Sequence, residues 1–266
     1  MSLSEIFFIP MYAICNLAQI PLRKEPSHAG EMISQVLFGE TVCVEKHENE
    51  WSYVRLTHDG YQGWVLQKQI EAVDENFFIT LKNRTQHVVA DTSIAFSFKN
   101  EEKMILPQGS YLPLFFDNKF RIGNEIYFVH CNTIEIPRSF KRENIINYAL
   151  SFLNTPYLWG GRSLLGIDCS GLVQVVYKWC GMQLPRDAYQ QVEMGETINF
   201  ISEAQEGDLA FFENAQGKII HVGIIMKDNK IIHASGKVRI DSIDHHGIFN
   251  EQMKEYTHNL RTIKRV

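Results

Sequence analysis

A cysteine and two later histidines are the residues of this chain best suited to covalent chemistry. Cys169 directly follows a glycine-containing loop and begins a stretch with an apolar stripe at helical spacing. The aligned peptide dipoles of a helix place about half a positive elementary charge at its N-terminus, which favours a thiolate over a thiol. A thiolate also needs a base, and His221 and His233 are the candidates. The competing interpretation is that Cys169 is a small buried apolar residue.

The two histidines lie in apolar segments that are predicted to be consecutive strands of a hairpin. If a three-residue loop pairs Met226 with Lys230, odd-numbered side chains share one face, because side chains alternate along a strand. His221 and His233 then become diagonal neighbours. This register places Asn229 in the left-handed conformation, which asparagine tolerates better than most residues. A two-residue loop would place the imidazoles on opposite faces.

The elements that must position these residues are predicted from apolar periodicity and turn signals. Residues 1–73 and 74–137 are each broken into short apolar runs separated by turns, which predicts two small β modules in tandem. Residues 138–266 show helical spacing followed by strand-like runs, so they are predicted to form a mixed domain. The expected elements of that domain are helices at 145–153 and 169–180, and strands at 208–212, 219–226 and 230–234.

Composition excludes several classes of partner. The formal charge is −5 and the basic residues are scattered, so no nucleic-acid footprint is present. No stretch approaches the roughly 18 apolar residues that suggest a membrane span. The five cysteines are widely spaced and contain no C-x-x-C pair, which predicts no zinc site and no disulfides and fits a cytoplasmic location. The pair His245-His246 has no third ligand at a recognisable spacing, so we expect no metal and no cofactor.

Ordered motifs in the two halves of the chain carry a resemblance to a known family. They are Asp168-Cys169-Ser170-Gly171, Gly207-Asp208-Leu209, His221-Val222-Gly223 and His233-Ala234, with residues 22–40 and 59–64 ahead of them. The C-terminal motifs resemble the NlpC/P60 peptidases, a papain-like family with a Cys–His–polar triad, over about residues 144–266. The N-terminal segments resemble the bacterial SH3 modules of γ-D-glutamyl-L-diamino acid endopeptidases. The implied fold is α+β, with a papain-like catalytic domain preceded by two SH3-like β-barrels.

The resemblance implies a reaction and assigns its residues. The bond cut would be γ-D-glutamyl–diaminopimelate or γ-D-glutamyl–lysine, in muropeptides with a free N-terminal L-alanine. Cys169 would attack the γ-glutamyl carbonyl, His221 would carry the proton to the departing amine, and His233 would orient His221. Tyr157 matches the family tyrosine whose hydroxyl, with the backbone N–H of Cys169, stabilises the oxyanion. Without the resemblance, Tyr157 is an ordinary aromatic of a loop that contains proline.

The resemblance also implies a recognition end for the ammonium group of the substrate. A buried ammonium requires a carboxylate, and Asp187 is the candidate, although its pattern with Gln190 equally predicts a helix N-cap. Tyr61 matches a tyrosine of the first SH3 module that joins this carboxylate; the alternative is a barrel aromatic beside Trp64. Related enzymes tend to have serine after the recognition aspartate, whereas this chain has Ala188. The other residues expected to line the cleft are Trp159, Asp168, Ser170 and Arg186.

Two other functions use the same residues. A papain-like acyltransferase would pass the acyl group to an amine or alcohol, and the mass of its product would distinguish it. A non-catalytic module would hold cell-wall peptides through its SH3-like part, although the complete nucleophile, base and orienting residue argue against it. Whether fragments or intact peptidoglycan are cut depends on whether Tyr61 and Asp187 meet near Cys169. The oligomeric state is not predicted.

Overall fold

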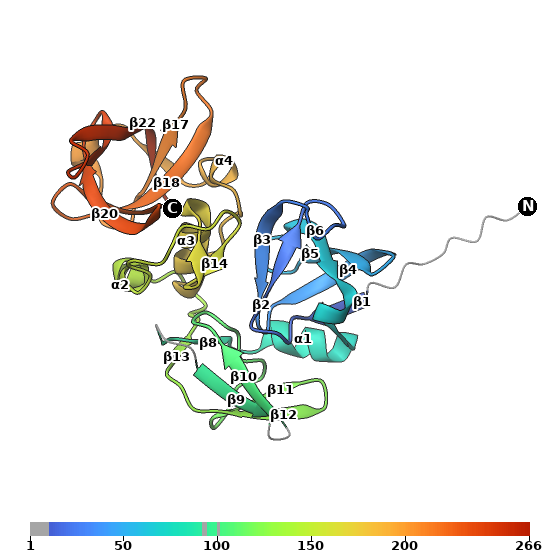
Figure 1. The fold of residues 1–266 in the computed structure, drawn as a ribbon. Coiled ribbons are helices and arrows are strands. Elements are labelled where there is room, and N and C mark those ends of the chain that lie inside the picture. The colour runs from blue at the N-terminus through green and yellow to red at the C-terminus, as the bar shows by residue number, and fades with distance from the viewer. Residues whose placement is uncertain (1–10, 92–94, 100–101) are drawn as a thin grey trace, which may run out of the picture.

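The computed structural model describes residues 11–91, 95–99 and 102–266 and has a mixed α+β fold. Residues 1–10 of the first predicted β module, and 92–94 and 100–101 of the second, lie outside the described part. Figure 1 shows three regions in chain order: an N-terminal sheet, small sheets in the middle region, and helices with a large sheet in the C-terminal region.

The N-terminal region is one antiparallel sheet of seven strands in the order β3-β2-β6-β5-β4-β1-β7. Its core is a cluster of buried aliphatic side chains, because short strands of alternating pattern turn their apolar residues inward. This confirms the β-rich character predicted for the region. Its elements are β1 (Met11–Ile14), β2 (Gln19–Arg23), β3 (Met32–Leu37), β4 (Thr41–Glu48), β5 (Trp51–Leu56), β6 (Gln62–Leu66), the 3₁₀ helix η1 (Gln67–Gln69) and β7 (Glu71–Val73).

The middle region contains a helix that the sequence analysis did not predict. Asp74 caps it, since its carboxylate accepts a hydrogen bond of 2.7 Å from the backbone N–H of Phe77. The core includes stacked rings of Phe120 and Tyr127, 4.8 Å apart between centroids. The elements are α1 (Glu75–Asn83), a two-stranded sheet of β8 (His87–Val89) and β13 (Thr133–Glu135), and a four-stranded sheet of β9 (Ala95–Lys99), β10 (Glu102–Leu106), β11 (Lys119–Ile122) and β12 (Glu125–Val129).

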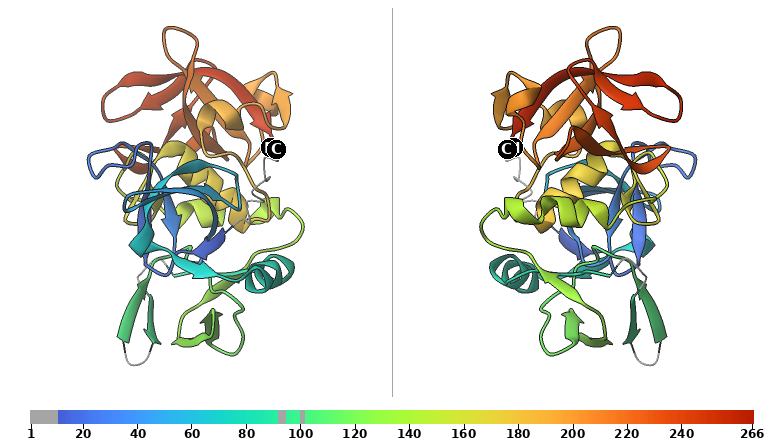
Figure 2. Two further views of the ribbon diagram at one scale, coloured as in Figure 1. Left: turned by 90° about the vertical axis from the view of Figure 1, so that its right-hand side faces the viewer. Right: turned by 90° about the vertical axis from the view of Figure 1, so that its left-hand side faces the viewer.

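The C-terminal region combines helices with a sheet that closes on itself (Figure 2). The strand order is β16-β22-β17-β18-β19-β20-β21, and β22 pairs with β21 as well as with β17. Strands β17 to β19 were predicted from the sequence, whereas the strands that complete the closure were not. The elements are η2 (Arg142–Asn144), α2 (Ile145–Leu150), β14 (Arg162–Ser163), β15 (Gly166–Ile167), α3 (Cys169–Trp179), α4 (Ala188–Gln191), β16 (Glu196–Ile198), η3 (Ile201–Glu203), β17 (Leu209–Glu213), β18 (Ile219–Met226), β19 (Lys230–Ser235), β20 (Lys237–Ile243), β21 (Gly247–Asn250) and β22 (Glu255–Arg265).

Helix α3 begins and ends where capping rules predict. Asp168 is its N-cap and accepts a hydrogen bond of 2.7 Å from the backbone N–H of Gly171. Gly181 follows the helix with a φ of +89°, a left-handed conformation that glycine adopts without steric cost. Every residue of α3 is buried, and the helix packs against β18 and β19. The predicted helix at 169–180 is therefore confirmed, and it carries Cys169 to the face of the sheet.

The hairpin of β18 and β19 has the predicted register. Met226 pairs with Lys230, so the loop has three residues, and Gly223 pairs with His233. Asn229 has a φ of 53°, as expected for its left-handed position. The numbers of paired residues add up to an even number, so odd-numbered side chains of both strands share one face. His221 and His233 therefore lie on the same face of the sheet.

No helix among the described residues is long and apolar enough to cross a membrane.

Candidate active site

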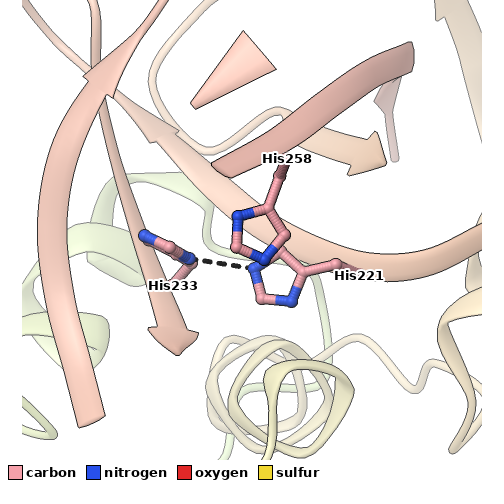
Figure 3. A group of neighbouring side chains, drawn as sticks. All are labelled: His221, His233 and His258. Carbon is pink, nitrogen blue, oxygen red and sulfur yellow. Dashed lines mark hydrogen bonds between the residues drawn. The ribbon is translucent and has the colours of Figure 1, made fainter. Parts of the chain in front are cut away.

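A chain of hydrogen bonds joins three neighbouring strands behind Cys169. His221 Nε2 lies 2.9 Å from His233 Nδ1, and His233 Nε2 lies 3.0 Å from the carboxylate of Asp241 (Figure 3 shows the two histidines). An ionised carboxylate only accepts, so His233 carries its proton on Nε2 and accepts at Nδ1. His221 must then donate from Nε2, which leaves its Nδ1 free to take a proton from a thiol. Asp241 thus sets the tautomers of both imidazoles.

Asp241 was missed by the sequence analysis, although the same alternation rule could have found it. Strand β20 pairs His233 with Arg239, so His233 and Asp241 are diagonal neighbours on one face. Arg239 Nε lies 2.7 Å from the Asp241 carboxylate. Although burial works in the opposite direction, the hydrogen bonds from His233 and Arg239 lower the pKa of Asp241, so it stays ionised. Strand β20 was not predicted from the sequence, and without it the position of Asp241 could not be inferred.

Cys169 and His221 are both neutral in the substrate-free protein. Burial, together with the negative charge of Asp168, raises the pKa of the Cys169 thiol to about 12. Burial and the neighbouring imidazoles hold the pKa of His221 well below its usual range. We expected from the sequence that the helix N-terminus would favour a thiolate. Burial outweighs that effect, so the thiol of Cys169 keeps its proton. The backbone N–H of Val222, next to His221, is oriented to hydrogen-bond the sulfur, which places Cys169 beside the base.

A buried ionic network fixes the start of α3. Arg186 binds the Asp168 carboxylate with two nitrogens, at 3.0 and 2.6 Å, and its Nη1 lies 2.9 Å from Ser170 Oγ. The Asp168 carboxylate also accepts a hydrogen bond of 2.8 Å from the backbone N–H of Gly160. Arg186 Nε also donates to Ser34 Oγ of the N-terminal region at 3.0 Å. The geometry makes Asp168, Ser170 and Arg186 a support for the nucleophile, built across two regions.

Tyr157 lies near the nucleophile, as the resemblance implied. Burial and the nearby Cys169 and Asp168 raise the pKa of its hydroxyl, so the group keeps its proton and can donate a hydrogen bond. Its backbone is anchored by a hydrogen bond of 3.0 Å from its N–H to the carbonyl of Gly236. The chain thus holds a neutral hydroxyl donor close to the thiol.

The structure brings Tyr61 and Asp187 together. The Tyr61 hydroxyl donates to the Asp187 carboxylate at 3.0 Å. Asp187 is also the N-cap of α4, and its backbone N–H donates to the Gln190 side chain at 3.3 Å, so the predicted helix cap is confirmed. Among the described residues Asp187 makes no ion pair. It is a half-buried carboxylate that the hydroxyl groups of Tyr61 and Tyr189 both approach, and the nearby Arg186 cation is already paired with Asp168.

Helix α4 places Asp187 at the same end of α3 as the nucleophile. The Gln191 side chain donates to the carbonyl of Ser170 at 3.1 Å, which ties α4 to the first turn of α3. Trp159 is 60% exposed, and its indole N–H donates to the Glu31 carboxylate at 2.9 Å. Glu31, like Tyr61, comes from the N-terminal region, and the sequence analysis had given it no role beyond its motif.

A second buried ionic cluster joins the N-terminal region to α3. Arg162 binds both oxygens of Glu40, at 2.8 and 3.0 Å, and Lys178 Nζ lies 3.0 Å from the same carboxylate. Although burial alone would raise it, these cations and His58 hold the pKa of Glu40 well below its usual range. A cavity of about 450 Å³ beside this cluster reaches Tyr111, and none of the candidate catalytic residues lines it.

Three histidines meet at the site, but they do not form a ready metal centre. One nitrogen each of His221, His233 and His258 lies within 4.8 Å of the others. The rings of His221 and His258 are stacked, however, at 28° to one another with centroids 4.2 Å apart. Imidazole lone pairs lie in the ring plane, so two rings this close to parallel do not point at one common ion.

Comparisons with known proteins agree with this geometry. The NlpC/P60 family model matches residues 154–258, and the bacterial dipeptidyl-peptidase SH3 domain matches residues 22–70. The γ-D-glutamyl-L-lysine dipeptidyl-peptidase of Bacillus subtilis is 33% identical over 76% of this chain and 71% of its own length. Dipeptidyl-peptidase 6 of Lysinibacillus sphaericus is 30% identical over 91% of this chain and 96% of its own.

Solved structures show the same fold. An NlpC/P60 family protein from Bacillus cereus aligns over 96% of this chain and 99% of its own, with a TM-score of 0.80 at 21% identity. The sequence motifs, the Cys–His–His arrangement and the two relatives point to one conclusion. The chain belongs to the NlpC/P60 family, as a cysteine peptidase of peptidoglycan peptides with an N-terminal bacterial SH3 domain.

Proposed function

We propose that the protein hydrolyses the γ-D-glutamyl–L-diamino acid bond of muropeptides that carry a free N-terminal L-alanine. The observation that carries this proposal is the contact between Tyr61 and Asp187, at 3.0 Å. A half-buried carboxylate that makes no ion pair of its own favours a cationic partner, and the ammonium group of a free L-alanine is such a partner. The names of the B. subtilis and L. sphaericus relatives support the same peptide class.

The first half of the reaction forms an acyl-enzyme. As the Cys169 sulfur attacks the γ-carbonyl carbon of D-glutamate, its proton passes to Nδ1 of His221, because both groups are neutral beforehand. The carbonyl oxygen gains negative charge and accepts hydrogen bonds from the backbone N–H of Cys169 and the hydroxyl of Tyr157. The C–N bond then breaks, and His221 returns the proton to the departing amine of the diamino acid.

The second half releases the dipeptide. Water takes the place of the departed amine, His221 Nδ1 accepts its proton, and the hydroxyl attacks the thioester carbonyl. The C–S bond breaks, Cys169 regains a proton from His221, and L-Ala-D-Glu leaves with a new carboxylate. Through both halves His233 and Asp241 hold His221 in one tautomer by the bonds of 2.9 and 3.0 Å.

We also propose three structural units with boundaries 1–73, 74–137 and 138–266, of which the second is another SH3-like barrel. The short antiparallel strands of the middle region and their common apolar core support this division. Its core also includes Ile14 and Phe38 of the N-terminal region, so the first two units pack together. We propose a cytoplasmic location, supported by five free cysteines.

The test is incubation with L-Ala-γ-D-Glu-L-Lys and its diaminopimelate counterpart, with products identified by mass. We expect L-Ala-D-Glu and the free diamino acid, and no product from Cys169→Ala. Cys131→Ala is the control, because Cys131 is a free thiol of the middle region. An amide or ester of L-Ala-D-Glu would support the acyltransferase alternative instead. Digestion of intact peptidoglycan at a rate similar to that of the tripeptide would contradict recognition of a free amine.

A further inference from the structure

A third histidine covers the exposed face of the candidate base. His258 lies on β22, and its ring stacks on His221 with centroids 4.2 Å apart and planes 28° apart. The same ring stands edge-on to His233, with centroids 5.6 Å apart (Figure 3). His258 Nδ1 lies 2.9 Å from Thr257 Oγ1, which fixes its orientation. The hydrogen-bond relay from Asp241 to His221 does not use this residue.

The position of His258 separates His221 from water. His221 is 5% exposed, whereas His258 is half-buried on the outer side of the stack. Below His221, α3 brings Cys169; beside it, β19 brings His233; and the neighbour from β17 is Phe212, which carries no charge. Removal of the His258 ring would therefore open this side of His221 to water.

The charge state of His258 suits this cover. Burial and the neighbouring His233 lower the pKa of His258 to about 4, against the opposing effect of Asp241. It is therefore neutral at neutral pH and does not repel the imidazolium that His221 becomes during acylation.

Titratable and charged groups approach His221 from several elements. They are Cys169 with Asp168 behind it on α3, His233 on β19, Asp241 and Arg239 beyond it on β20, and His258 on β22. Helix α4 also packs against β18, and its titratable groups are Asp187 and Tyr189. The Asp241 charge is balanced by Arg239 at 2.7 Å. Of these groups only His258 contacts His221 without serving the nucleophile or the relay.

We propose that His258 is a positioning residue, whose ring keeps His221 dry, neutral and aligned between Cys169 and His233. This inference rests on the proposed role of His221 as the base. It predicts that an uncharged aromatic ring of similar width at position 258 is sufficient.

The test compares His258→Ala with His258→Phe. In His258→Ala water reaches His221, so its pKa should rise towards the usual value of about 6.5, by about one pH unit or more. The acid limb of kcat/KM for L-Ala-γ-D-Glu-L-Lys should move up with it, and kcat should fall about tenfold because the base is no longer held. His258→Phe should keep the acid limb within about half a unit of the unchanged protein and retain most of kcat.

The position of an acid limb does not depend on the fraction of protein that folds, so partial misfolding of His258→Ala does not blur the result. His245→Ala is the matched control, since His245 is an exposed histidine whose ring contacts only that of His246 among the described rings. An unchanged acid limb in His258→Ala would overturn the proposal. So would a His258→Phe variant that behaves like His258→Ala, because a nitrogen rather than the ring would then be needed.

A second readout separates this inference from the proposed substrate. The titration of the His221 ring can be followed by NMR without any peptide, in the three variants and the unchanged protein. If the tripeptide is not cut but His258→Ala still raises the pKa of His221, the substrate assignment is wrong and the role of His258 stands. If the tripeptide is cut and the titration does not move, the inference about His258 is wrong.

Discussion

The Tyr61 hydroxyl lies 3.0 Å from the Asp187 carboxylate, although 126 positions separate the two residues in the chain. Tyr61 lies directly before β6 and packs against the core of the N-terminal sheet, whereas Asp187 caps a helix beside the nucleophile. Burial and the Asp187 charge raise the pKa of Tyr61, so the hydroxyl stays a donor. The SH3 domain of this enzyme thus contributes directly to the environment of its candidate recognition carboxylate.

Removal of the Asp187 charge should abolish the preference for a free amine. We expect Asp187→Asn to lower kcat/KM for L-Ala-γ-D-Glu-L-Lys about 10- to 100-fold, since a hydrogen bond to a charged group contributes roughly 1.5–3 kcal/mol. Tyr61→Phe should lower kcat/KM for the same peptide by a factor several times smaller. Assays of the free and the N-acetylated tripeptide check this. Tyr53→Phe is the control, because Tyr53 lies in the same sheet and its hydroxyl reaches only Gln62, at 3.5 Å.

The pH profile should show two limbs with different origins. Protonation of His221 removes the base, and its lowered pKa puts the acid limb of kcat/KM below about 6.5. Loss of the substrate ammonium should give an alkaline limb near its α-amino pKa, at about 8. The alkaline limb should be absent for the N-acetylated peptide. An acid limb at or above 6.5 would contradict a dry, neutral His221.

Asp241 should matter for rate and not for binding. Asp241→Asn can no longer enforce the tautomer of His233, so we expect kcat to fall about 10- to 100-fold with KM nearly unchanged, as for other partners that orient a catalytic imidazole. Steady-state kinetics measure both constants. Asp244→Asn is the matched control, because this carboxylate bonds Tyr256 at 2.5 Å and no catalytic candidate. A change in KM alone would argue that Asp241 contacts the peptide.

The Glu40 cluster should dominate the coupling between the SH3 domain and the peptidase region. Glu40→Gln removes the carboxylate that pairs with the buried cations of Arg162 and Lys178, and we expect a loss of about 3–5 kcal/mol in the free energy of unfolding. Urea denaturation measures it. Glu45→Gln, which breaks the more exposed pair with Arg55, should cost under about 1 kcal/mol. Equal losses in the two variants would mean that Glu40 does not couple the regions.

The same cluster makes the fold sensitive to acid. Glu40 and Asp59 have lowered pKa values in the folded protein, so the unfolded chain binds more protons once the pH falls below about 4.5. His58 and His258 also have lowered values, which extends the effect up to about pH 6.5. The free energy of unfolding should therefore be greatest above pH 6.5 and decline as the pH falls. Urea titrations at several pH values check the sign.

Local rules predicted the nucleophile and its base, but not what surrounds them. The helix at Cys169 follows from a cap and an apolar stripe, and the meeting of His221 with His233 follows from one loop length. The position of His258 over His221 depends on β22 also pairing with β17, which lies far away in the sequence, and alternation within one hairpin cannot supply that contact. The contact of Tyr61 with Asp187 could be expected only through the family resemblance.

Closure of the C-terminal sheet depends on a strand that is synthesised after the two strands it joins. Strand β22 joins β17 to β21 and follows both of them in the chain, so ribosomal synthesis makes it last. Until it emerges, the sheet has two free edges and the His258 ring is absent from the stack on His221. A peptidase domain built in this way therefore cannot close its sheet before this strand has been made.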